Sequence, residues 1–521
     1  MIPRLLALAL ASLCALPALA SAYIGIGGLP SQWEVVPGDV VDLYVSAWNQ
    51  GPDVAHDVVV TIGVLPGSVH ELLEAPAGWT CAMGDPIVCT TPAMAVAPGY
   101  EQETFRFRVT VGTGAFGNLV LPLSISASNG QRQETIIQWA VTRIIPVTTT
   151  ADSGDGSFRA ALDAANFFCA GATTRCRIVF NLAAPAVIEP LTPLPPIISC
   201  GLVHIDGAPG APEGDRAVEL SGSKLTSGSG LVVTAQCADG TRMTWIDDLA
   251  VNRFPGDGIA VAPGGPYEVR LNGLYLGTDV TGTLARPNGS RGIGITSPFA
   301  RVSIGGSIVS GNARSGIWVW DSEGVYVASS KIGVGADGRP LGNGASGIFI
   351  RRGVLQGYNN VVAYNAHWGI SASHGVRMAA VRDHSIHSNG VIGYDFGVDY
   401  LTLDESATNS AAPVITSATY DAATGFTTVT GTLRISSNRR YVYEVHLFSS
   451  ATRNAHGFVE GERWESFAPI PWADAERTAE WTIRVNGDLR GRILSAVSTG
   501  AIDAEFAPVI SSEFSLPLTV P

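Results

Sequence analysis

The chain has 521 residues, more than one core usually accommodates, so its length predicts several domains. It contains 60 glycines and only 15% charged residues, a composition that suits strands and turns better than helices. The formal net charge of -13 disfavours nucleic acids and anionic membranes as partners. It also makes a strongly anionic polysaccharide a less obvious ligand, unless a local basic patch or a cation compensates.

The first 22 residues have the features of a secretory signal peptide. Arg4 precedes an apolar run from Leu5 to Leu16, and Ala20-Ser21-Ala22 is the small-x-small pattern that a signal peptidase cuts. We therefore expect removal of residues 1–22, near Ala22, and a mature protein that is secreted or held at the cell surface. No later stretch has ~20 uninterrupted apolar residues, so we expect no transmembrane segment in the mature chain.

Six cysteines follow the signal, and an even number in an exported chain predicts disulfides. Pairs that are close in sequence lose the least entropy when they close a loop. This favours Cys81 with Cys89, Cys169 with Cys176 and Cys200 with Cys237. No CxxC or Cys/His spacing typical of zinc is present, and we expect no metal or cofactor.

Residues 23–145 alternate apolar and polar positions in short runs separated by turn residues, which predicts a β-sandwich. The turns include Pro37-Gly38-Asp39, Asn49-Gln50-Gly51-Pro52-Asp53, Leu65-Pro66-Gly67 and Gly78-Trp79-Thr80-Cys81. These turns resemble those of an immunoglobulin-like domain of bacterial surface proteins. The resemblance implies a spacer or interaction module without catalytic residues.

A short helix is predicted after a connector around residues 146–151. Ser157 can cap it, and Phe158, Ala161, Leu162 and Ala165 share one face. A solenoid of strands has an open end with unpaired edges and an exposed core. We expect this helix to cover that end.

A phrase of Asn, three variable residues, Gly and an apolar residue recurs five times between Asn288 and Phe396. Its anchors are Asn288 and Gly292, Asn312 and Gly316, Asn343 and Gly347, Asn365 and Gly369, and Asn389 and Gly393. The intervals between successive glycines are 24, 31, 22 and 24 residues, which indicates a solenoid with one repeat per turn. Apolar residues at plus one and plus three from each Gly, such as Ile317 and Val319, predict strands with those positions facing inward.

The recurring Asn and Gly are interpreted as structural turns, because both accept positive φ cheaply. Stacked Asn side chains can also bond along the turn. No run in this region has helical periodicity and caps, so the fold class predicted for it is a right-handed parallel β-helix.

The phrase Gly156-Ser157-Phe158-Arg159, Leu276-Gly277-Thr278-Asp279 and the Asn-x-x-x-Gly-Ile turns resemble a family of secreted bacterial right-handed β-helix proteins with the pectin-lyase-like fold. The resemblance covers residues 151–400. It implies little about activity, because members carry no agreed catalytic set. Residues 401–410 are interpreted as a linker, and the strand runs of residues 412–521 predict a second β-sandwich, similar to the domain that closes related proteins. The expected molecule is therefore all-β, with a capped β-helix flanked by two sandwiches.

Residues at equal offsets from the Gly anchors form columns, because neighbouring coils of such a fold stack at ~4.8 Å. The outward plus two, plus four and plus five columns contain a candidate patch of Trp318, Trp320, Asp321, Phe349, Arg351, Arg352 and His374. Flat aromatics beside charged groups can stack on sugar rings and bond hydroxyls. The alternative is that the patch docks one of the sandwiches or packs the wall of the helix.

An enzyme is the rival class, since pectin-cleaving enzymes share the β-helix and Ser373-His374-Gly375 is similar to one short motif of their hydrolases. A hydrolase needs paired carboxylates, and a lyase needs clustered acids for calcium with an Arg or Lys base. Asp383, His384 and His387 could bind a metal, although histidines at sequential strand positions point to opposite faces. The candidate catalytic pairs are Asp395 with Asp399 and Asp321 with Glu323. Each is as easily a solvated edge, so we predict an extracellular binding or scaffold protein whose partners are polysaccharides or surface proteins. Calcium enters only for a lyase, and the oligomeric state is left open.

Overall fold

The computed structural model describes residues 22–97, 101–171, 173–208, 218–234, 243–373, 376–378, 383–396, 411–435, 441–454, 456–470, 477–502 and 510–521. Among these the chain is nearly all β, with one helix, and no helix is long and apolar enough to cross a membrane. The predicted signal peptide up to Ser21, the linker at 401–410, Cys237, His374 and Asp399 lie outside the described residues. The chain divides into two units, residues 1–143 and 144–521.

The first unit contains two mainly antiparallel sheets that share one hydrophobic core. One sheet has the order β1 (Ile24–Pro30), β3 (Val40–Asn49), β8 (Glu103–Thr110) and β5 (Val69–Glu74). The other runs β10 (Gly130–Val147), β9 (Gly117–Ala127), β4 (Ala55–Ile62), β7 (Ile87–Met94) and β6 (Thr80–Ala82), and β2 (Glu34–Val35) pairs with β10. The predicted alternation is visible in β8, where Phe105, Phe107 and Val109 are buried. Cys81 on β6 is bonded to Cys89 on β7.

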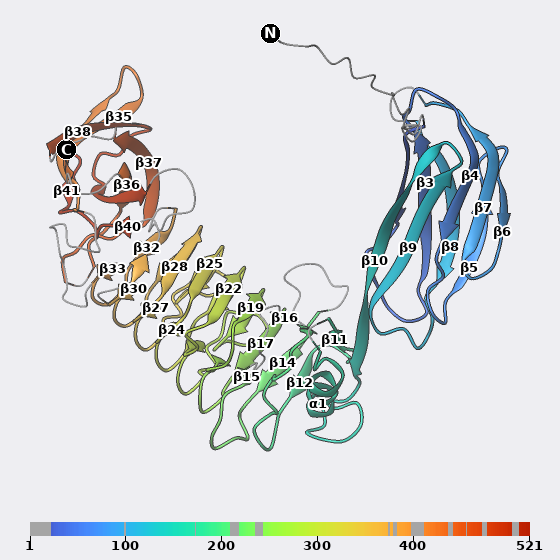
Figure 1. Ribbon diagram of the computed structural model, residues 1–521. Helices are drawn as coiled ribbons and strands as arrows, with labels where there is room; N and C mark the ends of the chain where they lie inside the picture. The colour runs from blue at the N-terminus through green and yellow to red at the C-terminus, as the bar shows by residue number, and fades with distance from the viewer. Residues whose placement is uncertain are drawn as a thin grey trace, which may run out of the picture. The chain divides into compact units, whose positions relative to one another are not determined.

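Three parallel sheets form the larger part of the second unit, and we call them together the parallel stack (Figure 1). The first sheet contains β11 (Arg175–Phe180), β13 (Leu202–Asp206), β16 (Met243–Asp247), β19 (Tyr267–Asn272), β22 (Ala300–Gly305), β25 (Gly324–Ala328), β28 (Val354–Tyr358) and β31 (Arg377–Met378). The second contains β12 (Ala186–Ile188), β14 (Val218–Ser221), β17 (Leu249–Asn252), β20 (Tyr275–Leu276), β23 (Ile308–Val309), β26 (Lys331–Ile332), β29 (Val361–Ala363) and β32 (Ser385–His387). The third contains β15 (Leu231–Val233), β18 (Ile259–Val261), β21 (Ile293–Ile295), β24 (Ile317–Val319), β27 (Ile348–Ile350), β30 (Ile370–Ala372) and β33 (Tyr394–Phe396).

From β16 onward each strand of the stack pairs with the strand three places later in the chain, as β16 does with β19, β17 with β20 and β18 with β21. The chain therefore visits the three sheets in turn, once per repeat, which is a solenoid-like arrangement. Its core contains the residues at plus one and plus three from each Gly anchor. For example, Ile317, Val319, Ile348 and Ile350 are at most 2% exposed, so the predicted inward positions are confirmed.

The predicted helix is α1 (Phe158–Phe168). Ser157 caps it, since its side-chain oxygen accepts a hydrogen bond from the N–H of Ala160. Its buried residues are Phe158, Ala161, Leu162 and Ala165, as predicted, and they belong to the same hydrophobic core as the strands of the stack. Cys169 at the end of α1 is bonded to Cys176 on β11. Cys200 is also disulfide-bonded.

The chain ends in two smaller antiparallel sheets, which we call the C-terminal sheets. One has the order β34 (Val414–Asp421), β35 (Phe426–Ile435) and β38 (Arg477–Asn486). The other contains β37 (Arg463–Ile470), β36 (Tyr441–Ser450), β39 (Ile493–Ile502), β40 (Ile510–Ser511) and β41 (Leu518–Thr519). They contact the end of the stack, because Gly461 bridges to Ile386 on β32, and Phe448 and Phe514 belong to the stack's core.

Five stacked asparagines, Asn288, Asn312, Asn343, Asn365 and Asn389, form a buried line of side chains that we call the Asn ladder. The Nδ2 of each donates to the Oδ1 of the next at 2.9 to 3.0 Å. The same Nδ2 atoms donate to backbone carbonyls, as Asn343 does to Val309. The expected bonding of stacked Asn side chains is therefore confirmed.

The sequence predicts that the recurring Asn and Gly are present because they accept positive φ, and this prediction is wrong for both residue types. None of the five Asn or their Gly partners has a positive φ; the residues just before three of the asparagines do, namely Gly311, Tyr364 and Ser388. The glycines are needed because the ladder passes against them. A Cβ on Gly316 would lie 2.8 Å from the Nδ2 of Asn343 and 2.8 Å from the carbonyl oxygen of Gly347.

A second buried line of polar groups precedes the second sheet. The N–H of Ser307 donates to the Oγ of Ser330, that of Ser330 to the Oδ1 of Asn360, and that of Asn360 to the Nδ1 of His384. We call these four residues the Ser–His ladder. Both ladders satisfy backbone donors that the turns leave without strand partners.

Candidate functional site

The predicted patch lies on the outward side of the third sheet. In register, one column contains Ala260, Gly294, Trp318, Phe349, Ser371 and Asp395. The two small residues before Trp318 and the buried Ser371 after Phe349 limit the large side chains to two neighbouring coils. We call Trp318, Trp320 and Phe349 the aromatic patch.

The three rings of the aromatic patch stack on one another. The rings of Trp318 and Trp320 lie 5.3 Å apart at 21°, and those of Trp318 and Phe349 lie 6.2 Å apart at 15°. Arginine side chains extend the stack: the guanidinium of Arg291 lies 3.7 Å from the Trp318 ring centre, and that of Arg351 lies 3.9 Å from the Trp320 ring centre. Such cation–π contacts contribute ~0.5–2 kcal/mol each. The ring faces of the aromatic patch are therefore covered largely by other side chains of the protein.

The arginines around the patch differ in their acidic partners. Arg291 lies 3.5 Å from Asp257, and Arg352 bonds Asp321 at 3.1 Å. Gly294 leaves space for Asp257, since a Cβ there would lie 2.2 Å from its Oδ2. Arg351 makes no ion pair among the described residues.

Exposure decides which part of the patch meets solvent. Trp320 is 43% exposed, whereas Trp318 and Phe349 are half-buried. Arg352 and Asp321 lie beside Arg351 and Trp320 on the same two coils. The most accessible part of the patch is therefore the edge of the Trp320 ring with the guanidinium of Arg351, and not a broad aromatic face. His374 of the predicted patch lies outside the described residues.

Those candidate catalytic residues that the structure describes do not lie together in one site. Asp321 pairs with Arg352, and Glu323 pairs with Arg301. His384 is buried in the Ser–His ladder, and burial lowers its pKa to about 4. The ring centres of His387 and Tyr364 lie 5.4 Å apart. Within the described ranges no three His, Cys, Asp or Glu side chains gather as a metal site would require.

The outward side of the first sheet carries a polar cluster that sequence reasoning missed. Asp206 and Asp247 are opposite each other on β13 and β16. Arg177 bonds Asp206, while the Nε2 of His204 lies 2.8 Å from the Oδ2 of Asp247. These residues lie on coils that precede the first Asn phrase at Asn288, so columns counted from the Gly anchors do not include them.

A groove of about 430 Å³ lies further along the same sheet. It is lined by Glu268, Arg301, Val302, Ser303, Glu323, Gly324, Val325, Tyr326, Val354 and Gln356. Tyr326 is 39% exposed and its ring meets that of Tyr358 at 6.1 Å. This face therefore also presents aromatic and charged groups.

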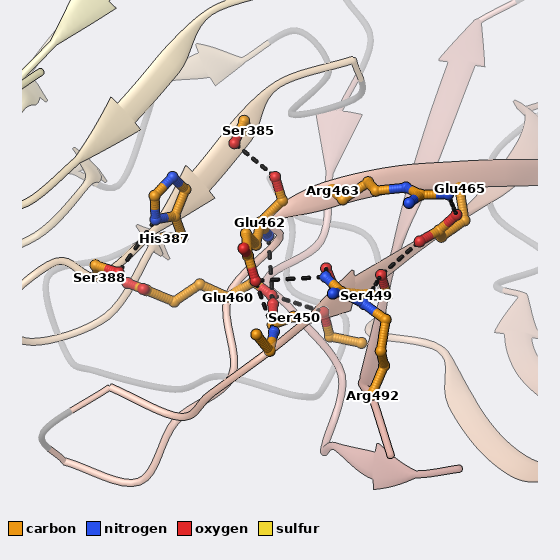
Figure 2. A network of polar contacts seen from close by, with 12 residues as sticks. Ser385, His387, Ser388, Ser449, Ser450, Glu460, Glu462, Arg463, Glu465 and Arg492 are labelled. Carbon is orange, nitrogen blue, oxygen red and sulfur yellow. Dashed lines mark hydrogen bonds and ion pairs between the residues drawn. The ribbon is translucent and has the colours of Figure 1, made fainter. Parts of the chain in front are cut away.

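A pocket of about 370 Å³ lies where the C-terminal sheets meet the end of the stack (Figure 2). Its lining includes Tyr364, His387, Asn389, Arg453, Asn454, Glu460 and Glu462. The carbonyl of Glu462 accepts a hydrogen bond from Ser385, and its carboxylate lies 3.4 Å from Arg492. Ser449 links Arg492 to Glu465, which pairs with Arg463, as Figure 2 shows.

Glu460 is the group of this pocket with the most strongly shifted pKa. It is 3% exposed, and burial raises the pKa of its carboxyl to about 7 although the nearby donors of Asn389, Ser388 and Asn454 favour the ionised form. Burial also lowers the pKa of His387, against the opposing effect of Glu462. The pocket therefore holds a carboxyl group and an imidazole that both favour their neutral forms.

No protein-family model matches the chain, and no curated protein matches it. Three solved structures share 9 to 13% identity with it. The match to the sporulation control protein Spo0M of Bacillus subtilis covers 23% of this chain, at a TM-score of 0.15. It spans 49% of Spo0M, about half the length of that protein. The match to a cycloisomaltooligosaccharide glucanotransferase of Paenibacillus sp., complexed with cycloisomaltoheptaose, covers 95% of this chain and 72% of that protein, at a TM-score of 0.18. The match to tailspike gp49 of the Acinetobacter baumannii bacteriophage Fri1, a capsular polysaccharide depolymerase, covers 67% of this chain and 72% of that protein, at a TM-score of 0.19. Likeness at these scores supports no conclusion on fold or function.

Proposed function

We propose that this chain is a secreted or surface-held scaffold that binds glycans through the edge of its aromatic patch. In this proposal residues 1–22 are a signal peptide and residues 23–145 form an immunoglobulin-like sandwich. Residues 151–400 form a right-handed parallel β-helix of the pectin-lyase-like kind, capped by α1, and residues 412–521 form a second sandwich. The three-sheet order of the stack supports the β-helix. The disulfides fit export into an oxidising compartment.

The observation that carries glycan binding is the pair of Trp320 and Arg351. Trp320 is 43% exposed, and the guanidinium 3.9 Å from its ring has no acidic partner among the described residues. Stacking holds that guanidinium in one orientation, so less side-chain entropy is lost when its donors bond a ligand. A planar fork beside an apolar ring edge suits the hydroxyl or carboxylate groups of a sugar unit.

The test is binding to a panel of plant and microbial polysaccharides by Trp320→Ala and Arg351→Ala. We expect each change to weaken binding by about tenfold, which corresponds to ~1.4 kcal/mol. The matched control is Phe299→Ala, which removes an aromatic of the same stack that is 55% exposed. Full binding by both patch variants, with loosened packing of the third sheet instead, would show that the patch serves the fold alone.

An enzyme acting on polysaccharide is the second candidate, and the cluster on the first sheet favours it. Asp206 and Asp247 are opposite each other, and His204 bonds Asp247. Paired carboxyl groups are the minimum that a hydrolase requires. Incubation of the same polysaccharides with the protein, with and without calcium, separates the candidates. New reducing ends or unsaturated products that Asp247→Asn abolishes would replace the binding function, and calcium dependence would indicate a lyase.

A further inference from the structure

The Asn ladder does not end at its last asparagine. The backbone N–H of each of Asn312, Asn343 and Asn365 donates to the Oδ1 of the next asparagine at 3.1 to 3.3 Å. The N–H of Asn389 donates instead to the Oε2 of Glu460, at 3.3 Å. Glu460 comes from the C-terminal sheets and stands in the place of a sixth asparagine.

The backbone around Glu460 also continues the stack. The N–H of Ile386 donates to the carbonyl of Gly461 at 2.7 Å, and the two residues form a β-bridge. The Cβ and Cγ of Glu460 lie 3.1 Å from the position of a Cβ on Gly393, where the other anchor glycines meet the Asn ladder. Glu460 and Gly461 therefore act as a short further rung.

The carboxyl of Glu460 accepts one bond of the rung and leaves its second oxygen buried. Each asparagine accepts through Oδ1 and donates through Nδ2, as Asn389 does to the carbonyl of Val362. Glu460 accepts through Oε2, and its Oε1 is buried with no hydrogen-bond partner among the described residues. Only a proton on the carboxyl keeps this buried group uncharged.

The groups that face Glu460 do not replace that proton with a positive charge. The ionisable groups of the pocket besides Glu460 are Tyr364, His387, Arg453 and Glu462. Arg492 lies beside Glu462, and Asp395 and Glu513 lie near Tyr394 on β33. Arg492 lies against Glu462, and the guanidinium of Arg453 donates to the carbonyl of Gly457. None forms a described ion pair with Glu460, which agrees with its pKa of about 7.

We propose that Glu460 is a pH-sensitive latch, which holds the C-terminal sheets on the end of the stack when protonated and weakens that contact when ionised. An ionised carboxylate at this position is 3% exposed and has no ion-pair partner among the described residues, and burial of an unpaired charge is costly. The latch concerns the contact within this unit, and it stands whether or not the aromatic patch binds glycans.

Hydrogen exchange of the amides of Asn389 and Ile386 in the full-length protein tests the latch. Their acceptors are Glu460 Oε2 and Gly461 O, so both report on opening of this contact. The comparison is wild type with Glu460→Gln, since a carboxamide reproduces the neutral rung at every pH. The exchange rate of wild type relative to this variant is expected to rise by up to tenfold per pH unit between about pH 4.5 and 7, and to level off above.

Two controls separate the proton from the shape of the rung. Glu460→Ala is expected to exchange faster than Glu460→Gln by a factor that does not change with pH. Glu480→Gln alters an exposed carboxylate on β38 and is expected to follow wild type at every pH. A constant ratio between wild type and Glu460→Gln across this range would overturn the latch, and so would a Gln variant that opens as readily as the Ala variant.

Discussion

Gly316 lies where two coils of the stack leave no space for a side chain. Its role differs from that of a turn glycine, since its φ is not positive. A Cβ at this position would contact the Asn343 Nδ2 and the Gly347 carbonyl, and these two groups are both held by hydrogen bonds. The Asn and the Gly of the repeated phrase are thus one unit: the asparagine fills the volume that the glycine leaves.

Gly316→Ala is therefore expected to lower the free energy of unfolding by about 1–3 kcal/mol, as overpacking of a core does. Urea denaturation measures the change. The matched control is Gly324→Ala on the same stack, where an added Cβ meets no atom within 4 Å. Equal stability of the two variants would show that the Asn ladder can shift and that close approach does not explain the glycine.

At the scale of elements, α1 is a short helix whose one apolar face belongs to the core of the stack. Helices of this length are marginal in isolation, so their caps and their packing decide whether they form. Ser157 is fully buried; its hydroxyl donates to Gly154 and accepts from the N–H of Ala160.

Ser157→Ala is expected to lower the free energy of unfolding by about 0.5–2 kcal/mol, since it removes the cap and leaves the partly buried N–H of Ala160 without its acceptor. The exposed Ser153→Ala is the control. Thermal or urea unfolding measures both variants. If Ser157→Ala melts together with its control, packing of Phe158 and Leu162 alone holds the helix in place.

Elements with a local pattern could be predicted from sequence. The inward Ile317 and Val319 and the apolar face of α1 follow from spacings of a few residues, which a linear reading detects. Glu460 completes the Asn ladder from a segment 71 residues away, and no periodicity within either segment indicates that contact. The sequence pattern suggests a metal-ligand role for His384, whereas the structure shows its Nδ1 accepting from the N–H of Asn360. Only the register of the coils brings Asn360 near, so a linear pattern does not reveal this role.

For the molecule as a whole, the two ladders end in titratable groups of opposite kind. His384 accepts the N–H of Asn360 through Nδ1 and is held neutral, with a pKa lowered to about 4. The unfolded chain binds a proton at this residue below about pH 6.5, so His384 makes stability rise with pH between about 4 and 6.5. Glu460 is protonated in the folded state up to about pH 7 and ionised in the unfolded chain above about 4.5. It therefore makes stability fall with pH across that window.

These opposite slopes largely cancel in the wild-type protein between about pH 4.5 and 6.5, so substitutions are needed to reveal them. Glu460→Gln is expected to become more stable than wild type as the pH rises from 4.5 to 7, by up to about 3 kcal/mol in total at ~1.4 kcal/mol per pH unit. His384→Asn, which keeps an acceptor for Asn360, is expected to gain over wild type as the pH falls from 6.5 to 4. Free energies of unfolding in urea, measured for the three proteins from pH 4 to 8, provide the comparison. Parallel curves for all three would mean that neither ladder end carries a proton equilibrium linked to folding, whereas curves that diverge in these opposite directions would identify both.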